Sequence, residues 1–417
     1  MELKRVVVTG MGALTPLGNT VDEYWNSLIN GVSGADMITL FDASKFRTKF
    51  ACEVKGFDAT QYLDRKEARK IDRFTQFALV VSDQAMADAG LTKDNINPDR
   101  IGVVFASGIG GLITFQHEVT DFARGDGTPR FNPFFIPKMI LDIAAGQISM
   151  RHNLRGPNFA VVSACASSTN AIMDTFNLIR LGKADILVTG GSEAVISEAG
   201  VGGFNAMKAM SERNDDPKTA SRPYDKDRDG FVMGEACGIL ILEELEHAKA
   251  RGAKIYCEIA GAGATADAHH ITAPHPEGLG AKNVMLVALD DAGMKADEID
   301  YINTHGTSTP IGDGAEVKAI VQVFGDHAYH LNISATKSMT GHCLGAAGVI
   351  EAIASIKAVI HDEVPPTINH FTDDPELDPK LNFTFNKSQK RTVRAALSNT
   401  FGFGGHNACV IVKKYVG

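Results

Sequence analysis

The sequence lacks the features of several large classes of protein. It has no excess of basic residues, because 41 Lys and Arg stand against 50 Asp and Glu and leave a net charge of −9. A general nucleic-acid binder is expected to be basic. No collagen-type glycine repeat occurs, and a hydrophobic content of 44% is too high for a disordered chain. We therefore expect a globular protein that binds no nucleic acid.

Signals for secretion and membrane insertion are also missing. The first residues, MELKRVVVTGMG, run directly into a strand-like apolar segment, without the charged and apolar regions of a secretory signal. No uncharged apolar run reaches about 18 residues, so no membrane span is expected. The six cysteines are sparse and form no CxxC pair. This usage favours a reducing cytoplasm, where a special cysteine would be catalytic rather than disulfide-bonded.

Common cofactor and hydrolase motifs are absent or imperfect. The patterns GxxxxGK[ST], GxSxG and HExxH do not occur. GAGATA, at residues 261–266, fits a dinucleotide fingerprint, but neither a convincing helix nor the expected acidic residue follows. DKDRDGFVMGE, at residues 225–235, nearly matches a calcium loop, but Ala236 takes the place of its bidentate glutamate. We expect no cofactor and no metal.

The sequence does have short β-branched runs that alternate with longer helical patterns. This alternation is typical of an α/β protein with a mixed sheet covered by helices. Strands are expected at Val6–Thr9, Ile101–Ala106, Val161–Ala164, Ile186–Thr189, Ile239–Leu242, Ile255–Ala260, Tyr301–Thr304, Ala395–Thr400 and Ala408–Val412. Helices are expected at Phe74–Ala89, Ala166–Leu181, Gly280–Ala292, Gly314–Phe324 and Leu344–Ile360.

The two parts of the chain are similar to each other. A helix ending in ADAGL precedes the strand in NPDRIGVVFASG, and a helix ending in DDAGM precedes the strand in DEIDYINTHGTS. The helices after Cys165 and His342 are small or apolar on nearly every face, which is typical of a helix buried on all sides. We therefore expect two duplicated halves, residues 1–252 and 253–417, around a central helical layer. The alternative is a chance parallel between α/β segments.

Cys165 lies in VVSACASSTNAI, where a predicted strand ends and a predicted helix begins. The free N–H groups and the dipole of a helix N-terminus favour an anion. We therefore expect this position to lower the thiol pKa from about 8.5 and to supply donors for an oxyanion. A buried, inert cysteine that acts as a small hydrophobic residue is the alternative.

Two histidines occupy comparable places. His305 follows a predicted strand in YINTHGTSTP, and His342 precedes the second apolar helix in SATKSMTGHCLGAAG. With Cys165 they could converge on one pocket, although either ring alone could be structural. Lys337 stands in an otherwise uncharged run, where a buried ammonium would need an acid such as Glu351. The ordinary alternative is a surface lysine.

Two further segments could serve binding. FGFGGHN, at residues 401–407, is a glycine-rich turn whose aromatic residues could cover a pocket or simply close a hairpin. Lys66, Arg69 and Lys70 share one face of a predicted helix, and we call them the basic patch. In an acidic protein this patch could receive an acidic partner, or it could be a solvated helix face.

Four motifs together resemble a known family. VVSACASS, NTHGTSTPIGD, SATKSMTGH with LGAAG, and FGFGG occur in the order and at the spacing of the β-ketoacyl-acyl-carrier-protein synthases of fatty-acid synthesis. The likeness is greatest to the elongating type II condensing enzymes. SRPYDKDRDGFVMGEACG is also similar to a segment of that family. The resemblance extends from VVVTGMG to FGFGGHN, which is almost the whole chain.

The resemblance implies a thiolase-like α/β fold, layered αβαβα from two similar halves, in a homodimer. It implies a decarboxylative Claisen condensation in which Cys165 takes an acyl chain from acyl-carrier protein as a thioester. His305 and His342 would hydrogen-bond the malonyl thioester and stabilise the enolate formed on loss of CO2. Lys337 and Glu351 would be an orienting, charge-balancing pair.

The same resemblance implies binding roles. The backbone N–H groups of Cys165 and Phe403 would form the oxyanion hole. Phe403 would also gate the acyl pocket, with Ile109 near the lining. The basic patch would meet the acidic carrier protein.

The chain departs from the family pattern at a few positions. His406 stands where threonine is usual, which puts the hydrogen bonding beside the gate in question, and Thr304 stands where alanine is common. Cys343 is expected to be a core residue and not the second, basic cysteine of a biosynthetic thiolase. Two rival interpretations are a non-catalytic partner like a chain-length factor and an acyltransferase or loading-type synthase with one His and one Asn. Retention of Cys165 with two histidines disfavours both.

Overall fold

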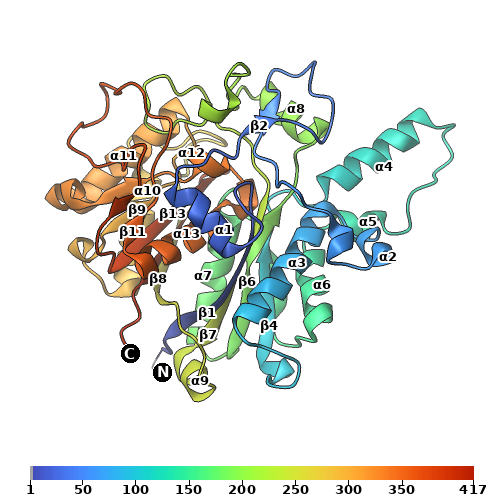
Figure 1. Cartoon of the computed structure of the whole chain (residues 1–417), viewed down its shortest axis with the longest axis horizontal. Helices are drawn as coiled ribbons and strands as arrows, with labels where there is room; N and C mark the ends of the chain where they lie inside the picture. Colours follow the sequence, from blue (N-terminus) through green and yellow to red (C-terminus); the bar gives the residue numbers. More distant parts are fainter. Residues whose placement is uncertain (1–2) are drawn as a thin grey trace.

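The computed structural model describes residues 3–417 and is dominated by one ten-stranded mixed sheet (Figure 1). The strand order is β10-β9-β13-β14-β8-β1-β7-β6-β4-β5. The strands are β1 (Val6–Leu14), β4 (Ile101–Ala106), β5 (Asn158–Val161), β6 (Ile186–Glu193), β7 (Ala236–Glu244), β8 (Cys257–Ala266), β9 (Tyr301–Asn303), β10 (Asn332–Ser334), β13 (Ala395–Gly402) and β14 (His406–Lys413). Two short ribbons pair β2 (Asp36–Met37) with β3 (Phe50–Ala51) and β11 (Glu363–Val364) with β12 (Gln389–Lys390).

The sheet consists of two halves with the same strand order. Along the chain, each half places its third, second, fourth, fifth and first strand side by side, as β5-β4-β6-β7-β1 and as β10-β9-β13-β14-β8. In each half the first three strands of this order are parallel, and the remaining pairs are antiparallel. The halves join where Val6–Val8 of β1 pair with β8. The expected duplication is confirmed.

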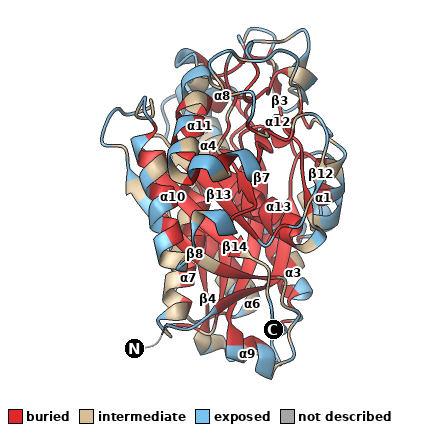
Figure 2. Cartoon of the chain, turned by 90° about the vertical axis from the view of Figure 1, so that its left-hand side faces the viewer, coloured by how far each residue is buried: buried red, intermediate tan, exposed pale blue. Residues whose placement is uncertain are grey.

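A central layer of two helices lies between the halves of the sheet. Helix α7 (Ser167–Arg180) packs on β6 and β4, and α13 (Ala347–His361) packs on β7 and β13. Because side chains alternate along a strand, Val104 and Leu240 face this layer, whereas the neighbouring Val103 faces the outer one. Nearly all of α13 is buried, as Figure 2 shows.

Outer helices complete the expected αβαβα layers. Helices α3 (Arg73–Asp88) and α6 (Ile143–His152) cover the first half, and α10 (Leu279–Ala292) and α11 (Pro310–Phe324) cover the second. The other α-helices are α1 (Val21–Ile29), α2 (Arg65–Ala68), α4 (Leu112–Arg124), α5 (Phe135–Met139), α8 (Glu198–Ala206), α9 (Leu245–Ala250) and α12 (Lys337–Thr340). Helix α4 extends away from the layered body (Figure 1).

Some expected boundaries are wrong. The third expected strand lies earlier, at Asn158–Val161, because the chain turns at Ala164, which has a left-handed φ of 51°. Leu344–Ile360 is not one α-helix, since a 3₁₀ turn over Leu344–Ala346 precedes α13. Strand β1 continues through GMG because Gly10 lies against α3. A Cβ there would lie 2.6 Å from the Ala85 carbonyl oxygen.

The segment Leu344–His361 is long and apolar enough to cross a membrane by length and composition. Within the protein, 89% of that stretch is buried. It carries Glu351 and Lys357, and it consists of α13 and the 3₁₀ turn that precedes this helix. The run is therefore the core of the layered fold.

Candidate active site

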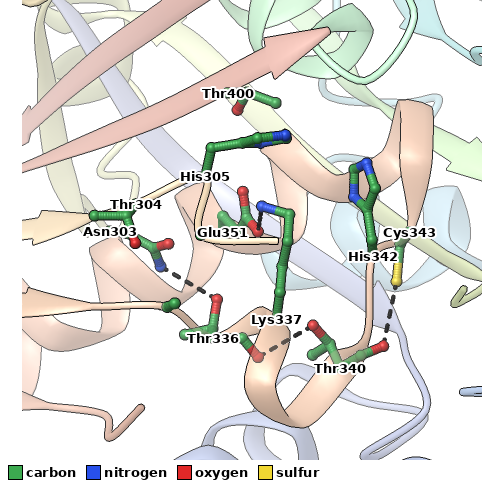
Figure 3. Close-up of polar contacts among 12 residues, drawn as sticks. Asn303, Thr304, His305, Thr336, Lys337, Thr340, His342, Cys343, Glu351 and Thr400 are labelled. Atoms are coloured by element: carbon green, nitrogen blue, oxygen red, sulfur yellow. Dashed lines mark hydrogen bonds and ion pairs between the residues drawn. The ribbon is translucent and has the colours of Figure 1, made fainter. Parts of the chain in front are cut away.

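Cys165, His305 and His342 meet at one end of the central layer. Cys165 lies just before α7, His305 follows β9, and His342 lies between α12 and the turn that leads into α13. His342 Nε2 is 3.0 Å from Cys165 Sγ, although 177 positions separate the two residues. The centres of the His305 and His342 rings are 5.2 Å apart, and the ring planes are perpendicular. Figure 3 shows the two rings. The structure therefore brings the three side chains into one site.

The thiol of Cys165 is buried, and this sets its acidity. Burial raises the pKa of Cys165 to about 12, while Lys337 and backbone hydrogen bonds from Phe403 and Cys165 itself act in the opposite direction. The expected lowering of the thiol pKa is therefore wrong: the donors at the helix N-terminus are present, but loss of solvent outweighs them. The resting thiol is protonated and can donate to His342 Nε2.

Both imidazoles are neutral. The pKa of His305 and that of His342 lie well below the ordinary histidine value. Burial is the larger cause, and the nearby ammonium of Lys337 is the second. Each Nδ1 is buried without a hydrogen-bond partner in residues 3–417. A neutral ring still carries one N–H donor. When the Cys165 thiol does not donate to His342 Nε2, that nitrogen can carry the ring proton, and the pair can then donate two hydrogen bonds to a developing oxyanion without bearing charge.

Lys337 and Glu351 form a buried ion pair beside the histidines (Figure 3). Lys337 begins α12, Glu351 lies in α13, and both side chains are almost completely buried. Burial raises the pKa of Glu351 to about 7, and Lys337 opposes that shift. Removal of one partner from such a pair costs about 3–5 kcal/mol of stability. The pair therefore holds a compensated positive charge next to both rings.

A cavity of about 380 Å³ leads to the sulfur. Cys165, both histidines and Phe403 line it, and the exposed Ile311 lies at its rim. Phe403 belongs to the turn between β13 and β14, which covers the site as the FGFGGHN motif suggests.

Ile109 lies behind the cavity wall. It does not line the cavity itself but packs against the apolar cluster that contains Cys165 and Leu344.

The basic patch lies elsewhere. Lys66, Arg69 and Lys70 are exposed on and just after α2, and none of them forms a salt bridge within the described residues. Lys70 Nζ lies 5.5 Å from the centre of the Phe134 ring. The patch does not line the cavity, so any partner that it binds would dock on the surface.

Three further residues lie beside the two histidines, and one of them was not expected from the sequence. Cys343 is buried in the core, and Thr304 accepts a 2.6 Å hydrogen bond from the Tyr224 hydroxyl. Sequence analysis missed Glu316, whose oxygens accept from the backbone N–H groups of His305 and Gly306, each at 3.0 Å. Two acidic residues, Asp313 and Glu316, in the first turns of a helix that follows the His305 motif are the signal that could have revealed it.

Comparisons with known proteins agree with this architecture. The chain matches the models "Beta-ketoacyl synthase, N-terminal domain" over residues 3–248 and "Beta-ketoacyl synthase, C-terminal domain" over residues 256–371. It is 52% identical to 3-oxoacyl-[acyl-carrier-protein] synthase 2 of Synechocystis sp., over 100% of this chain and 99% of that protein. The protein of the same name from Staphylococcus aureus is 50% identical over 99% of each chain.

Solved structures are similar over the same length. One is a ketosynthase bound to the hexaketide in complex with its type II polyketide acyl-carrier protein. It shares 32% identity, with a TM-score of 0.90 over 99% of this chain and 100% of that one. The expected thiolase-like fold is confirmed, and the chain belongs to the beta-ketoacyl synthase family.

Proposed function

We propose that the protein is a 3-oxoacyl-acyl-carrier-protein synthase that elongates a fatty acyl chain by two carbons in a decarboxylative Claisen condensation. The observation that carries this proposal is the contact of Cys165 Sγ with His342 Nε2 in a lined cavity that His305 also faces. A non-catalytic partner would not need this nucleophile with two neutral imidazoles.

In the first step, the Cys165 sulfur attacks the thioester carbonyl of an acyl-carrier protein. The bond between that carbonyl carbon and the carrier sulfur breaks, and the thiol proton passes through His342 to the departing carrier thiolate. Because the buried thiol is protonated at rest, its attack needs an adjacent proton acceptor, and His342 Nε2 is the ring nitrogen in contact with it. The acyl chain remains on Cys165 as a thioester.

In the second step, malonyl-carrier protein loses CO2, and the electron pair of the broken bond is delocalised into an enolate. The enolate oxygen accepts hydrogen bonds from His305 and His342 while its carbon attacks the acyl carbonyl. Backbone N–H groups of Cys165 and Phe403 hold the resulting oxyanion until the sulfur leaves, and a proton from solvent restores the thiol. Loss of CO2 produces the carbanion without a strong base, so no second catalytic cysteine is required.

Intact-mass measurement with peptide mapping tests this function. The protein is incubated with carrier proteins that bear acyl chains of graded length. We expect a mass gain equal to the acyl group, located on the peptide that contains Cys165. The other five cysteines are buried free thiols and serve as internal controls. No adduct, or an adduct on another cysteine, would contradict the proposal.

We propose that acyl-carrier protein docks on the basic patch, which is exposed and free of salt bridges within residues 3–417. Replacing Lys66, Arg69 and Lys70 by glutamate should raise the KM for carrier-bound substrate at least about tenfold, with a smaller effect at high salt. The KM for a small thioester mimic should not change. The same reversal at the exposed Lys93, Lys183 and Lys295 is the matched control. A KM unaffected by the patch variant would leave these residues as a solvated helix face.

We propose a homodimer, with its interface at the open edge of β5 and on α4. Strand β5 ends the sheet, and Phe159 on it is 40% exposed. Helix α4 likewise exposes Phe115 and Phe122. Sedimentation equilibrium should give twice the chain mass of 44.6 kDa, and Phe159→Asp should shift the protein toward the single-chain mass. A wild-type protein with the mass of one chain would contradict this assembly.

We also propose a division between the two halves at residues 252–253 and a cytoplasmic location. The boundary is supported by Gly252, which turns the chain after α9 with a left-handed φ of 68°. The location is supported by six free cysteines.

A further inference from the structure

Glu193, the last residue of β6, is a buried carboxylate that the reaction steps above do not use. Its side chain is completely buried and forms no salt bridge within residues 3–417. Burial raises its pKa, and hydrogen bonds oppose the shift. A buried carboxylate without a cation is costly unless donors compensate it. The identity of those donors therefore indicates what the residue does.

Five donors surround the carboxylate. Oε2 accepts from the backbone N–H groups of Gly108 at 2.7 Å and Gly345 at 2.9 Å. Oε1 accepts from the Ser107 hydroxyl at 3.0 Å and the backbone N–H of Ile109 at 3.1 Å, with that of Gly110 at 3.4 Å.

These donors belong to two separate segments. One is the pocket loop, residues 107–110, which follows β4. The other is the helix turn, residues 343–346, which links His342 to α13. The segments touch directly, since a Cβ on Gly345 would clash with the backbone nitrogen of Gly108. A Cβ on Gly108 would lie 2.7 Å from Glu193 Oε2. One carboxylate therefore clamps two glycine-bearing segments together.

The clamped segments carry two apolar residues beside the nucleophile. Ile109 of the pocket loop and Leu344 of the helix turn belong to the cluster that surrounds Cys165. Leu344 also lines the cavity. Leu344 lines the cavity beside the sulfur and Ile109 packs behind its wall, so a shift of either segment would change the space open to an acyl chain on Cys165.

We propose that Glu193 is a positioning residue that fixes the pocket loop against the helix turn and thereby sets which acyl chain lengths Cys165 accepts. The proposal rests on the proposed function, because it requires an acyl chain on Cys165. Glu193 acts on chain length through Ile109 and Leu344 and touches no reacting atom. Its charge also raises the pKa of Cys165, an effect that is the same for every chain length.

Glu193→Gln tests this role because it keeps the shape but turns one acceptor into an N–H donor that faces other N–H groups. Acyl transfer to Cys165 is measured with carrier proteins that bear short, medium and long saturated chains. We expect the ratio of rates between the best and the worst chain length to fall at least about tenfold. Malonyl decarboxylation, which does not use the acyl path, should change much less.

Glu53→Gln is the matched control. Glu53 is also a buried glutamate that accepts from a hydroxyl and backbone N–H groups, but its donors are those of Thr39 and Leu40 and belong to neither the pocket loop nor the helix turn. It should change thermal stability without changing the length ratio. If Glu193→Gln does not fold, Ser107→Ala removes one donor to Glu193, together with the acceptor of the Gly110 N–H, and should shift the length ratio in the same direction by a smaller amount.

The outcomes separate this inference from the proposed function. A wild-type protein that never acylates Cys165 would contradict the proposed function. If the wild-type protein acylates Cys165 but a folded Glu193→Gln or Ser107→Ala variant has an unchanged length ratio, only the positioning role of Glu193 is overturned. An equal fall of the length ratio in Glu53→Gln would also overturn it, because a general loss of stability would then explain the effect.

Discussion

Replacing Cys165 by alanine is expected to abolish acyl-enzyme formation and to reduce condensation at least about 10⁴-fold. The reason is that the acyl chain must leave its carrier before the second substrate can react, and this sulfur is the one in contact with His342. Intact mass of the variant after incubation with acyl-carrier protein should show no adduct. An elongation assay with both carrier substrates should show no product above background.

Cys343→Ala is the control for that experiment. Cys343 lies next to His342 but is buried in the core, and its sulfur contacts the Thr340 carbonyl oxygen at 3.7 Å. This variant should still acylate Cys165. Malonyl decarboxylation should persist in Cys165→Ala because both histidines remain. An alanine variant that still elongates at the wild-type rate would overturn the assignment of the nucleophile.

Replacing either histidine by alanine is expected to slow malonyl decarboxylation by about 10²–10³-fold, the usual cost of one lost oxyanion donor. His305→Ala should slow acyl transfer less than decarboxylation, because its ring does not contact the sulfur, whereas His342→Ala should slow both half-reactions, because His342 also carries the thiol proton in the first step. The two half-reactions can be measured separately as CO2 release and as mass gain on Cys165. Small and equal losses in both would count against the enolate role.

The pH dependence provides an independent readout of the same donors. Because burial lowers both histidine pKa values well below 6.5, the rings stay neutral as the pH falls through 6.5. Decarboxylation should therefore show no loss or gain in that range from histidine protonation. His361→Ala, at the exposed far end of α13, is the control and should leave both half-reactions unchanged.

The layered fold could largely be predicted from the sequence because strong patterns mark its core. Ile101–Ala106 is a fully apolar strand and has the expected bounds. The strand β10 (Asn332–Ser334) is three residues long and too short to show any alternation. Helix α4 escaped prediction because it is not packed into the layers, so its exposed Phe115 and Phe122 break the usual pattern of an amphipathic surface helix.

The candidate site was predictable in its residues but not in its energetics. Motif spacing singled out Cys165 and the two histidines, and isolated charges in apolar runs suggested that Lys337 and Glu351 would pair. The thiol pKa was predicted in the wrong direction because the local sequence shows a helix start but not the depth of burial. Glu193 was missed because its five donors come from segments that only the folded chain brings together.

The spread of the site along the chain has a consequence for biosynthesis. The residues that line the cavity extend from Cys165 to Phe403 and beyond, so a ribosome must finish almost the entire polypeptide before the site can form. A prematurely terminated product that lacks β13 and β14 would uncover the parts of α7 and α13 that pack on those two strands. Such a fragment would expose apolar surface and be a target for chaperones and proteases.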